Sequence, residues 1–184
     1  MRRLRWIVLV LVLLLVGGVV AAALLVRPPL VDAQEALDAR WVPLRAPLAT
    51  RYTALGGVAT ALTAAGEGNR AVTKELTAEL ARWNAFALRG AKHTNPGAET
   101  ASADQLEALA RRARANVAAS ARLAADPAIA AALAAFDQAV ITPATVTAYN
   151  RAVREYQRTR EGTIESLVAQ TLGFDARPEL LVGT

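Results

Sequence analysis

The chain has 184 residues, of which 54% are hydrophobic, and it carries a formal net charge of +5 at pH 7. It contains no cysteine, which excludes disulfides, thiol catalysis, iron–sulfur clusters and thiolate zinc sites. The sequence pI near 10.4 points toward nucleic acid, but four of the 21 basic residues and none of the 16 acidic residues lie in residues 1–29. The rest of the chain therefore carries only +1, which does not supply the concentrated basic face that binds nucleic acid.

Residues 6–26 form an uninterrupted run without a charged side chain, with Trp6, Leu14 and Val26 at its start, centre and end. As an α-helix the run is about 31 Å long, which matches a hydrocarbon core of about 30 Å. Residues 1–29 therefore predict a basic flank and a transmembrane anchor, through which the protein contacts the lipid bilayer.

A cleaved secretory signal is the alternative to an anchor, because small residues follow the apolar centre at positions 21–23. The apolar run continues to Arg27, however, which favours an uncleaved anchor. Three arginines precede the run and Arg27 alone follows it directly, so the positive-inside rule predicts a cytoplasmic N-terminus. Arg40 and Arg45 oppose this bias. The expected protein is single-pass in the cell membrane, with the remaining chain outside the cytoplasm.

The first helix after the anchor is expected to begin at a capping box formed by Asp32 and Glu35. Pro43 and Pro47 predict a kink, because the apolar stripe keeps its phase across both prolines. Gly66 belongs to a Gly-Glu-Gly sequence that predicts the end of this helix. The apolar stripe has steps of three or four, typical of one buried face, and consists of Leu37, Trp41, Leu44, Leu48, Tyr52, Leu55, Ala59 and Leu62.

Two further helices are expected, with a loop at residues 93–100 between them. Asn69 is the expected cap of the first, and Ser102 and Gln105 form the capping box of the second. The buried stripe of the first is Val72, Leu76, Leu80, Trp83 and Ala87, opposite a solvated face of Lys74, Glu75, Glu79 and Arg82. The buried stripe of the second is Leu106, Leu109, Ala113 and Val117.

Asp126 and Thr142 each precede a proline, a pattern that predicts two more helix starts. Gly173 is expected to close the last helical stretch. The stripes of these segments are Ile129, Leu133, Phe136 and Val140, then Val146, Tyr149, Val153 and Tyr156, then Ile164, Leu167, Val168 and Thr171.

The strand-like alternation of apolar and polar residues is absent from the chain. The sequence therefore predicts an all-α fold with an N-terminal transmembrane helix. An antiparallel bundle of about four helices with a kinked first helix is expected over residues 30–176, followed by a C-terminal tail at 177–184.

Chemical motifs are missing from the sequence. There is no P-loop, GxGxxG, GxSxG or HExxH pattern, and His93 is the only histidine. Glu75 and Glu79 are paired on a face expected to be solvated, where buried acid–base chemistry is not expected. We therefore predict no catalytic, metal-binding or cofactor-binding residues, no cofactor, and a protein that is not an enzyme.

Residues 148–156 resemble the YNxAVxxYN signature of the LemA family through Tyr149, Asn150, Val153 and Tyr156. The chain departs from the signature at Gln157, where the family has a second asparagine. Three other matches stand in the same order along the chain as in the family. They are Trp41 with Arg51 ten residues later, the break at Asp126, and the closing pair Gly173 and Phe174.

The resemblance implies a single-span membrane protein with a helical-bundle domain and no established biochemical activity. It brings no catalytic residue. We interpret the signature as structural: Tyr149, Val153 and Tyr156 fill the seam between helices, and Asn150 bonds a neighbouring backbone. A ligand-binding role for these residues is the alternative.

Two functions follow from these expectations. The first is a membrane-anchored, non-enzymatic scaffold or interaction protein of the cell envelope, with unidentified protein partners. The second is a ligand- or signal-sensing bundle, in which residues 41–47 and the seam at Tyr149 and Tyr156 line a pocket. A cavity at that place would favour the second function, and a packed seam would count against it. A secreted enzyme is the least supported reading, and the sequence leaves open whether the bundle forms a homo-oligomer.

Overall fold

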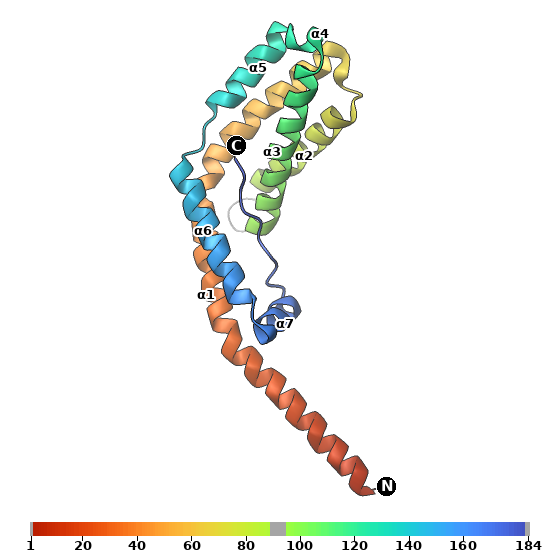
Figure 1. Cartoon of the computed structure of the whole chain (residues 1–184), viewed down its shortest axis with the longest axis vertical. Helices are drawn as coiled ribbons and strands as arrows, with labels where there is room; N and C mark the ends of the chain where they lie inside the picture. The colour runs from red at the N-terminus through yellow and green to blue at the C-terminus, as the bar shows by residue number, and fades with distance from the viewer. Residues whose placement is uncertain (1, 89–94, 183–184) are drawn as a thin grey trace.

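A computed structural model describes residues 2–88 and 95–182; for residues 2–24, 87, 88 and 164 it describes the backbone alone (Figure 1). This part of the chain is helical and contains no strand, which confirms the expected all-α class. In chain order its elements are α1 (Arg2–Leu62), the π-helical turn η1 (Thr63–Glu67), α2 (Ala71–Leu88), α3 (Pro96–Ala118), α4 (Ala121–Ala124), α5 (Pro127–Gln138), α6 (Pro143–Arg160) and α7 (Thr163–Leu172).

Helix α1 is the central element of the fold. Helices α2, α3, α5 and α6 lie along its upper two-thirds (Figure 1). Helix α2 returns antiparallel to α1, α3 rises beside α2, and α5 and α6 descend along α1. Helices α5 and α6 are two pieces of one descending arm, bent by 66° at the break between them. The described residues thus hold seven α-helices, where about four were expected, because this arm is broken and the short α4 and α7 are added.

The apolar stripe of α1 is buried along its whole expected length, from Leu37 to Leu62. Four prolines lie inside the helix, and α1 curves along its length without breaking (Figure 1). Proline has a helical φ angle, so the helix continues, and the missing N–H groups are accommodated by bending. The helix start expected at Asp32 is therefore wrong, because α1 runs through this position from the apolar run.

Gly66 lies in η1, directly after α1, and ends this helical stretch with a φ angle of +86°, a conformation that favours glycine. The reversal that follows lets α2 turn back along α1. The sequence-based end of the helix at Gly66 is therefore confirmed. Beyond it, Val72, Leu76, Leu80 and Trp83 are buried, as expected for α2; the side chain of Ala87 lies outside the described residues.

Helix α3 begins at Pro96, so the expectation of a loop through Thr100 is wrong. Asn95 caps the helix by accepting a hydrogen bond from the Ala98 N–H at 3.1 Å, and proline is favoured at the first helical position. Ser102, expected in a capping box, is buried inside the helix. His93 lies outside the described residues.

The later helix starts are confirmed in different degrees. Asp126 caps α5 by accepting from Ala128 N at 2.8 Å and from Ile129 N at 3.2 Å. Thr142 precedes α6 but makes no side-chain capping bond. Val140 was expected in the core and is 72% exposed, because α5 ends two residues earlier and the chain turns there.

Helix α7 confirms only part of its expected stripe. Val168 is buried, as expected, whereas Leu167 and Thr171 are exposed and Ala169 is buried in their place. The side chain of Ile164 lies outside the described residues. Gly173 closes α7 with a φ angle of +74°, as expected. Residues 174–182, called the C-terminal segment below, are extended and packed on the bundle, with Phe174, Arg177 and Leu180 buried.

The apolar run at residues 6–26 is helical in its backbone as part of α1. The side chains of Trp6 and Leu14 lie outside the described residues, and that of Val26 is partly buried against the core. Within the described part of the chain, no single helix is long and apolar enough to cross a membrane; α5 and α6 reach that length and hydropathy only as a bent pair.

Candidate functional site

The inner face of α6 binds the backbone of the C-terminal segment through polar side chains. Asn150 makes two hydrogen bonds with Leu180: its Nδ2 donates to the Leu180 carbonyl at 3.1 Å, and its Oδ1 accepts from the Leu180 N–H at 2.8 Å. The Tyr156 hydroxyl donates to the Asp175 carbonyl at 3.0 Å, and Gln157 Nε2 donates to the Arg177 carbonyl at 2.9 Å. The segment runs antiparallel to α6, whose side chains bind its backbone at Asp175, Arg177 and Leu180.

Tyr149 joins this face to two other elements. Its hydroxyl lies 3.1 Å from Thr100 Oγ1 of α3 and 3.4 Å from the Pro178 carbonyl, and its ring packs on Trp41 of α1 at 5.3 Å between centroids. Val153, one turn further along α6, is fully buried. The signature-like residues of α6 therefore meet at one place, where they join α1, α3 and the C-terminal segment.

Glu99 is a buried carboxylate that fixes the start of α3 to α1. It is 4% exposed and accepts from Trp41 Nε1 at 2.5 Å. Arg45 donates to the same carboxylate through Nε at 2.8 Å and Nη2 at 3.2 Å. Three charge-assisted hydrogen bonds of this kind compensate for the removal of the carboxylate from water.

Arg51 and Glu107 form a second buried ion pair, between the C-terminal part of α1 and the middle of α3. The two hydrogen bonds are bidentate, at 2.6 and 3.0 Å. The guanidinium also lies 3.9 Å from the centre of the Phe136 ring. Its Nη1 donates to the carbonyls of Phe136 and Ala139, so a positive charge caps the C-terminal end of α5, where the helix dipole favours it.

The expectation of a solvated Glu75 and Glu79 pair is wrong for Glu79. Glu79 is 5% exposed and accepts from the Ser102 hydroxyl at 2.5 Å, which joins α2 to α3. Glu75 is exposed and pairs with Arg112 at 2.6 Å. The two carboxylates therefore have separate partners, Ser102 for Glu79 and Arg112 for Glu75.

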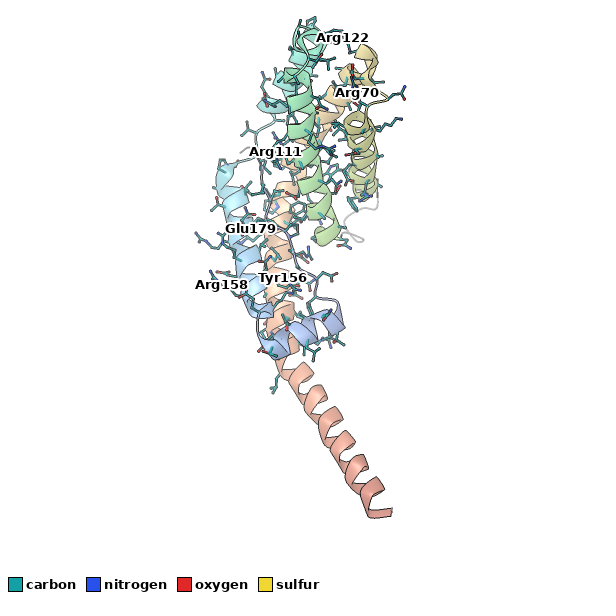
Figure 2. The ribbon with its side chains drawn as sticks, turned by 45° about the vertical axis from the view of Figure 1, so that its right-hand side comes forward. Arg70, Arg111, Arg122, Tyr156, Arg158 and Glu179 are labelled. Atoms are coloured by element: carbon teal, nitrogen blue, oxygen red, sulfur yellow. The ribbon has the colours of Figure 1, made fainter. Side chains whose placement is uncertain are left out.

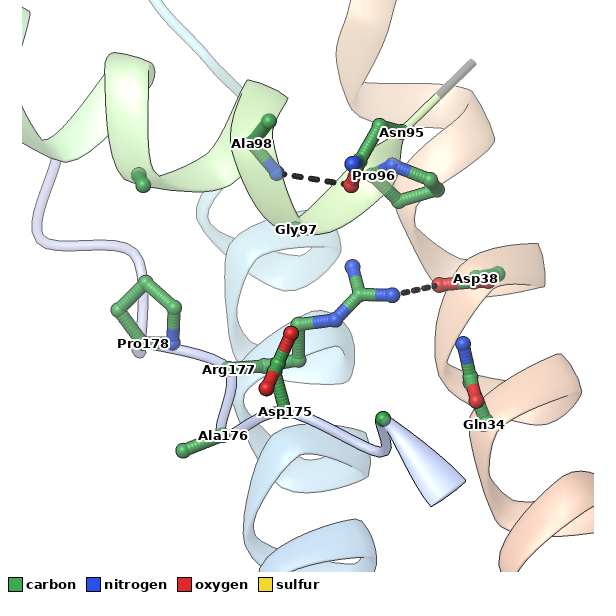
Figure 3. A pocket seen from close by; sticks show the side chains of 12 residues that line it. Gln34, Asp38, Asn95, Pro96, Gly97, Ala98, Asp175, Ala176, Arg177 and Pro178 are labelled. Atoms are coloured by element: carbon green, nitrogen blue, oxygen red, sulfur yellow. Dashed lines mark hydrogen bonds and ion pairs between the residues drawn. The ribbon is translucent and has the colours of Figure 1, made fainter. Parts of the chain in front are cut away.

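A cavity of about 620 Å³ lies between α1, the start of α3 and the C-terminal segment (Figure 3). Its wall includes Gln34 and Asp38 of α1, Asn95 before α3, and Asp175 and Arg177. The guanidinium of Arg177 points across the cavity toward Asp38, with Nη2 3.1 Å from Oδ1 (Figure 3). Polar groups of both signs thus line this cavity.

Close packing holds Arg177 in this place. A Cβ at Gly97 would lie 3.2 Å from Arg177 Cζ and Nε, so glycine allows the helix to pass directly over the guanidinium. Burial raises the pKa of the Asp38 carboxyl above its ordinary 3.8, and the nearby positive charges of Arg177 and then Arg45 oppose this rise. Burial therefore disfavours the charged Asp38 carboxylate, and the two arginines offset part of this cost.

The seam at Tyr149 and Tyr156 does not line the cavity. Trp41, Tyr149 and Tyr156 are at most 1% exposed, so this place is filled by packed rings. The cavity lies beside the seam, and its charged residues, Asp38 and Arg177, were not singled out by the sequence pattern.

Burial raises the pKa of all three tyrosines in the chain. The shift is largest for Tyr52, whose hydroxyl donates to the Ala103 carbonyl at 3.1 Å and lies near the negative charge of Glu107. For Tyr149 and Tyr156 desolvation is also the largest cause, and the charge of Arg177 partly opposes it. The tyrosines are therefore neutral packing groups over the physiological range.

The buried carboxylates Glu79, Glu99 and Glu107 connect neighbouring helices, and the sequence stripes missed them. Glu99 lies on the same helix face as the buried residues Ala103, Leu106, Ala110 and Ala113, at steps of three or four residues. This spacing was the sequence signal that could have predicted its burial. Among the residues whose side chains are described, no cluster of three or more His, Cys, Asp or Glu is placed to hold a metal ion.

Comparison of the chain with known protein families, with curated proteins and with solved structures finds no match. The resemblance to the LemA family therefore rests on the order and spacing of its own residues: Trp41 and Arg51 in α1, the four signature positions in α6, and Gly173 with Phe174 at the end of α7.

Proposed function

We propose that the chain is a membrane-anchored, non-enzymatic helical-bundle protein of LemA type, which acts as a scaffold or interaction protein of the cell envelope. The observation that carries this proposal is the continuity of α1 from Arg2 to Leu62. One helix joins the apolar run at residues 6–26 to the buried stripe of the bundle, with no flexible linker between them. Such an element suits a domain that is held at a fixed place on a membrane.

The buried polar groups support a structural role for the bundle. Glu79, Glu99 and Glu107 are each buried, and each is bound to a side chain of another helix. Carboxylates that are paired in this way hold the helices in register. On this proposal, the surface of the bundle binds the partners, and the buried contacts keep that surface in a fixed shape.

Membrane extraction of the full-length protein tests the anchor. We expect the chain to remain in the membrane fraction after alkaline carbonate washing and to leave it in detergent. N-terminal sequencing of the mature protein is expected to show a start before Trp6, with the apolar run retained. A mature N-terminus near Ala23, or recovery in the carbonate supernatant, would refute the anchored state.

The side of the membrane is tested by protease accessibility. With the N-terminus in the cytoplasm, as Arg2, Arg3 and Arg5 favour, protease added outside the cytoplasmic membrane of intact cells digests the bundle. A bundle that is cleaved only after lysis would reverse the orientation and leave the anchor in place. Proximity labelling from the bundle in its native membrane would then identify the partners.

The packed seam at Tyr149 and Tyr156 counts against a ligand pocket at that place. The separate cavity beside Asp38 and Arg177 is the one observation that favours a second function, the sensing of a small polar ligand by the tethered bundle. A compound that raises the melting temperature of the natural chain and not that of Arg177→Gln would support it. A broad panel of polar metabolites that leaves both melting temperatures unchanged would count against it.

A further inference from the structure

The C-terminal segment is held on the bundle in the way that a separate extended peptide is held. It rises from α7 along α6, with Tyr156 beside its lower part and Glu179 higher up (Figures 1 and 2). Phe174 donates its N–H to the Ala169 carbonyl of α7 at 2.8 Å. Beyond Phe174, within the described part of the chain, no backbone–backbone hydrogen bond joins residues 175–182 to another element. Side chains of the bundle therefore hold the rest of the segment.

Helix α6 binds the segment mainly through the segment's backbone. Asn150, Tyr156 and Gln157 make four hydrogen bonds to backbone atoms, at 2.8–3.1 Å. Three of the four go to carbonyl groups, which every residue type carries, so they recognise an extended chain whatever its sequence. The pair of Arg154 with Glu179 at 3.0 Å is partly exposed at both side chains and contributes little. Grooves of this kind take affinity from main-chain bonds and selectivity from side-chain pockets.

The side-chain pockets take every third residue of the segment. Phe174, Arg177 and Leu180 are 8%, 6% and 1% exposed, whereas Asp175 and Ala176 between them are exposed. A repeat of three residues matches an extended chain of the polyproline II type. The groove therefore selects a chain with an apolar residue, an arginine three positions later, and a second apolar residue three positions after that.

The segment fills the arginine pocket incompletely. Arg177 lines the cavity of about 620 Å³, whose facing walls come from α1 and the start of α3. Asp38 Oδ1 is buried and, among the described residues, has no hydrogen bond, although Arg177 Nη2 lies 3.1 Å from it as an ion pair. A segment with few buried contacts opens locally at a lower free energy than the whole fold. The groove therefore has room for a partner chain whose arginine donates to Asp38 directly.

We propose that the groove formed by α6, α1 and the start of α3 is a peptide-binding surface, with the C-terminal segment as its resident occupant. The partner that it fits is an extended segment of another protein, with an arginine flanked at three positions on each side by an apolar residue. The resident segment is tethered, so it competes at an effective concentration in the millimolar range, and a partner binds when this segment is released. The inference rests on the interaction role of the proposed function and does not require the membrane anchor.

The test uses the full-length chain in detergent and a fluorescein-labelled peptide with the sequence of residues 174–182. Leu180→Asp puts a charge into a pocket in which Leu180 is 1% exposed, so this variant is expected to release its own segment and leave the groove residues unchanged. Asn150→Ala in the same background removes two hydrogen bonds from the groove. A peptide that carries Arg177→Gln is the control for the arginine pocket.

We expect saturable peptide binding to the Leu180→Asp chain, measured by fluorescence anisotropy, and weaker binding to the natural chain, because its own segment competes. Adding Asn150→Ala is expected to weaken peptide binding about 5- to 150-fold, the effect of two hydrogen bonds. The Arg177→Gln peptide is expected to bind more weakly than the natural peptide. No binding to a Leu180→Asp chain that circular dichroism shows to be folded, equal binding with Asn150→Ala, or equal binding of the two peptides would overturn the inference.

Native-state hydrogen exchange tests the release of the segment in the natural chain, without any variant. The Leu180 N–H, which donates to Asn150 Oδ1, is expected to exchange faster than the most protected amides of α1 and α3. Exchange of Leu180 only at the rate of those amides would overturn the inference, because the segment would then leave the groove only when the whole chain unfolds. Carbonate washing tests the anchor separately, so a chain that is anchored and binds no peptide contradicts the inference alone.

Discussion

The side chain of Asn150 pairs with both backbone groups of Leu180, as a neighbouring β-strand would do. One amide thereby satisfies a donor and an acceptor of an extended segment that has no strand beside it. Tyr156 and Gln157 continue the same face of α6 and bind the carbonyls of Asp175 and Arg177. The side chains of a helix can hold an extended segment in this way because each backbone group then has a partner.

Replacing Asn150 by alanine is expected to weaken this contact. Two hydrogen bonds of about 0.5–1.5 kcal/mol each are lost, so the free energy of unfolding falls by about 1–3 kcal/mol in a urea titration. Limited proteolysis within residues 175–182 is expected to become faster. Asn116→Ala is the control, because Asn116 is exposed on α3. Cleavage of both variants at the rate of the natural chain would contradict the role of Asn150.

The ion pair between Arg51 and Glu107 is expected to be the most sensitive polar contact of the bundle. Arg51→Ala leaves a buried carboxylate without its partner and removes the cap of α5, which costs about 3–5 kcal/mol of unfolding free energy. The double variant Arg51→Met with Glu107→Met removes both charges, and we expect it to recover most of that loss.

The matched control for Arg51 is Arg112, whose pair with Glu75 is about half exposed at both side chains. Arg112→Ala is expected to cost less than about 1 kcal/mol in the same chemical denaturation experiment. A similar loss for Arg51→Ala and Arg112→Ala would show that burial of the first pair does not determine its contribution.

The three tyrosines predict how the fold responds to alkali. Their folded-state pKa values are raised above the ordinary 10.0, so the folded chain keeps protons that the unfolded chain has already lost. The resulting contribution to stability is fully present below pH 10 and is lost as the pH rises beyond it. We expect phenolate absorbance and the loss of helical circular dichroism to appear together above pH 10. Tyrosine ionisation near pH 10 with the helices intact would contradict their burial.

The helices and their buried faces could be predicted from the sequence because a helix with one buried face has apolar residues at a regular spacing. Every expected apolar position of α1 between Leu37 and Leu62 is buried, since a helix with one covered face must repeat apolar residues at three or four positions. The same reasoning missed Glu99 and Glu107, which lie in α3 among the buried positions. A charged residue at a position that the helical repeat predicts to be buried needs a partner on another helix. The local repeat carries no information about which residue that partner is.

The C-terminal segment had no sequence signal for a different reason. Its residues lack helical or strand periodicity, because the partners of its backbone are side chains of α6. The expectation of a tail followed from this lack of a pattern. Likewise, Arg177 reaches Asp38 across 139 positions of the chain, a contact that only the assembled fold creates.

Asp38 predicts a change of stability with acid. Its carboxyl has a raised pKa in the folded state, so the folded chain binds more protons than the unfolded chain as the pH rises from 3.8 to that raised value. Stability from this group therefore falls as the pH rises through that window. Relative to Asp38→Asn, which does not titrate there, the natural chain is expected to gain unfolding free energy as the pH is lowered toward 3.8.

Arg177→Gln extends this test. Removing the guanidinium takes away the largest influence that lowers the Asp38 pKa, so the window is expected to reach a higher pH than in the natural chain. The measurement is the free energy of unfolding of all three proteins between acid and neutral pH. Parallel curves for the natural chain and Asp38→Asn would rule out a buried, titrating Asp38.

Gly97 and Gly56 give opposite expectations for the same substitution. Both glycines lie within helices, and replacing glycine by alanine in a helix stabilises it by about 0.5–1 kcal/mol when there is space. A Cβ at Gly56 meets nothing within 4 Å, so Gly56→Ala is expected to raise the unfolding free energy by this amount. At Gly97 the new methyl group lies 3.2 Å from the buried guanidinium of Arg177 and displaces it from Asp38. We therefore expect Gly97→Ala to give no gain in urea denaturation and faster proteolysis of the C-terminal segment; equal stabilisation by the two alanines would show that Arg177 is free to move away from α3.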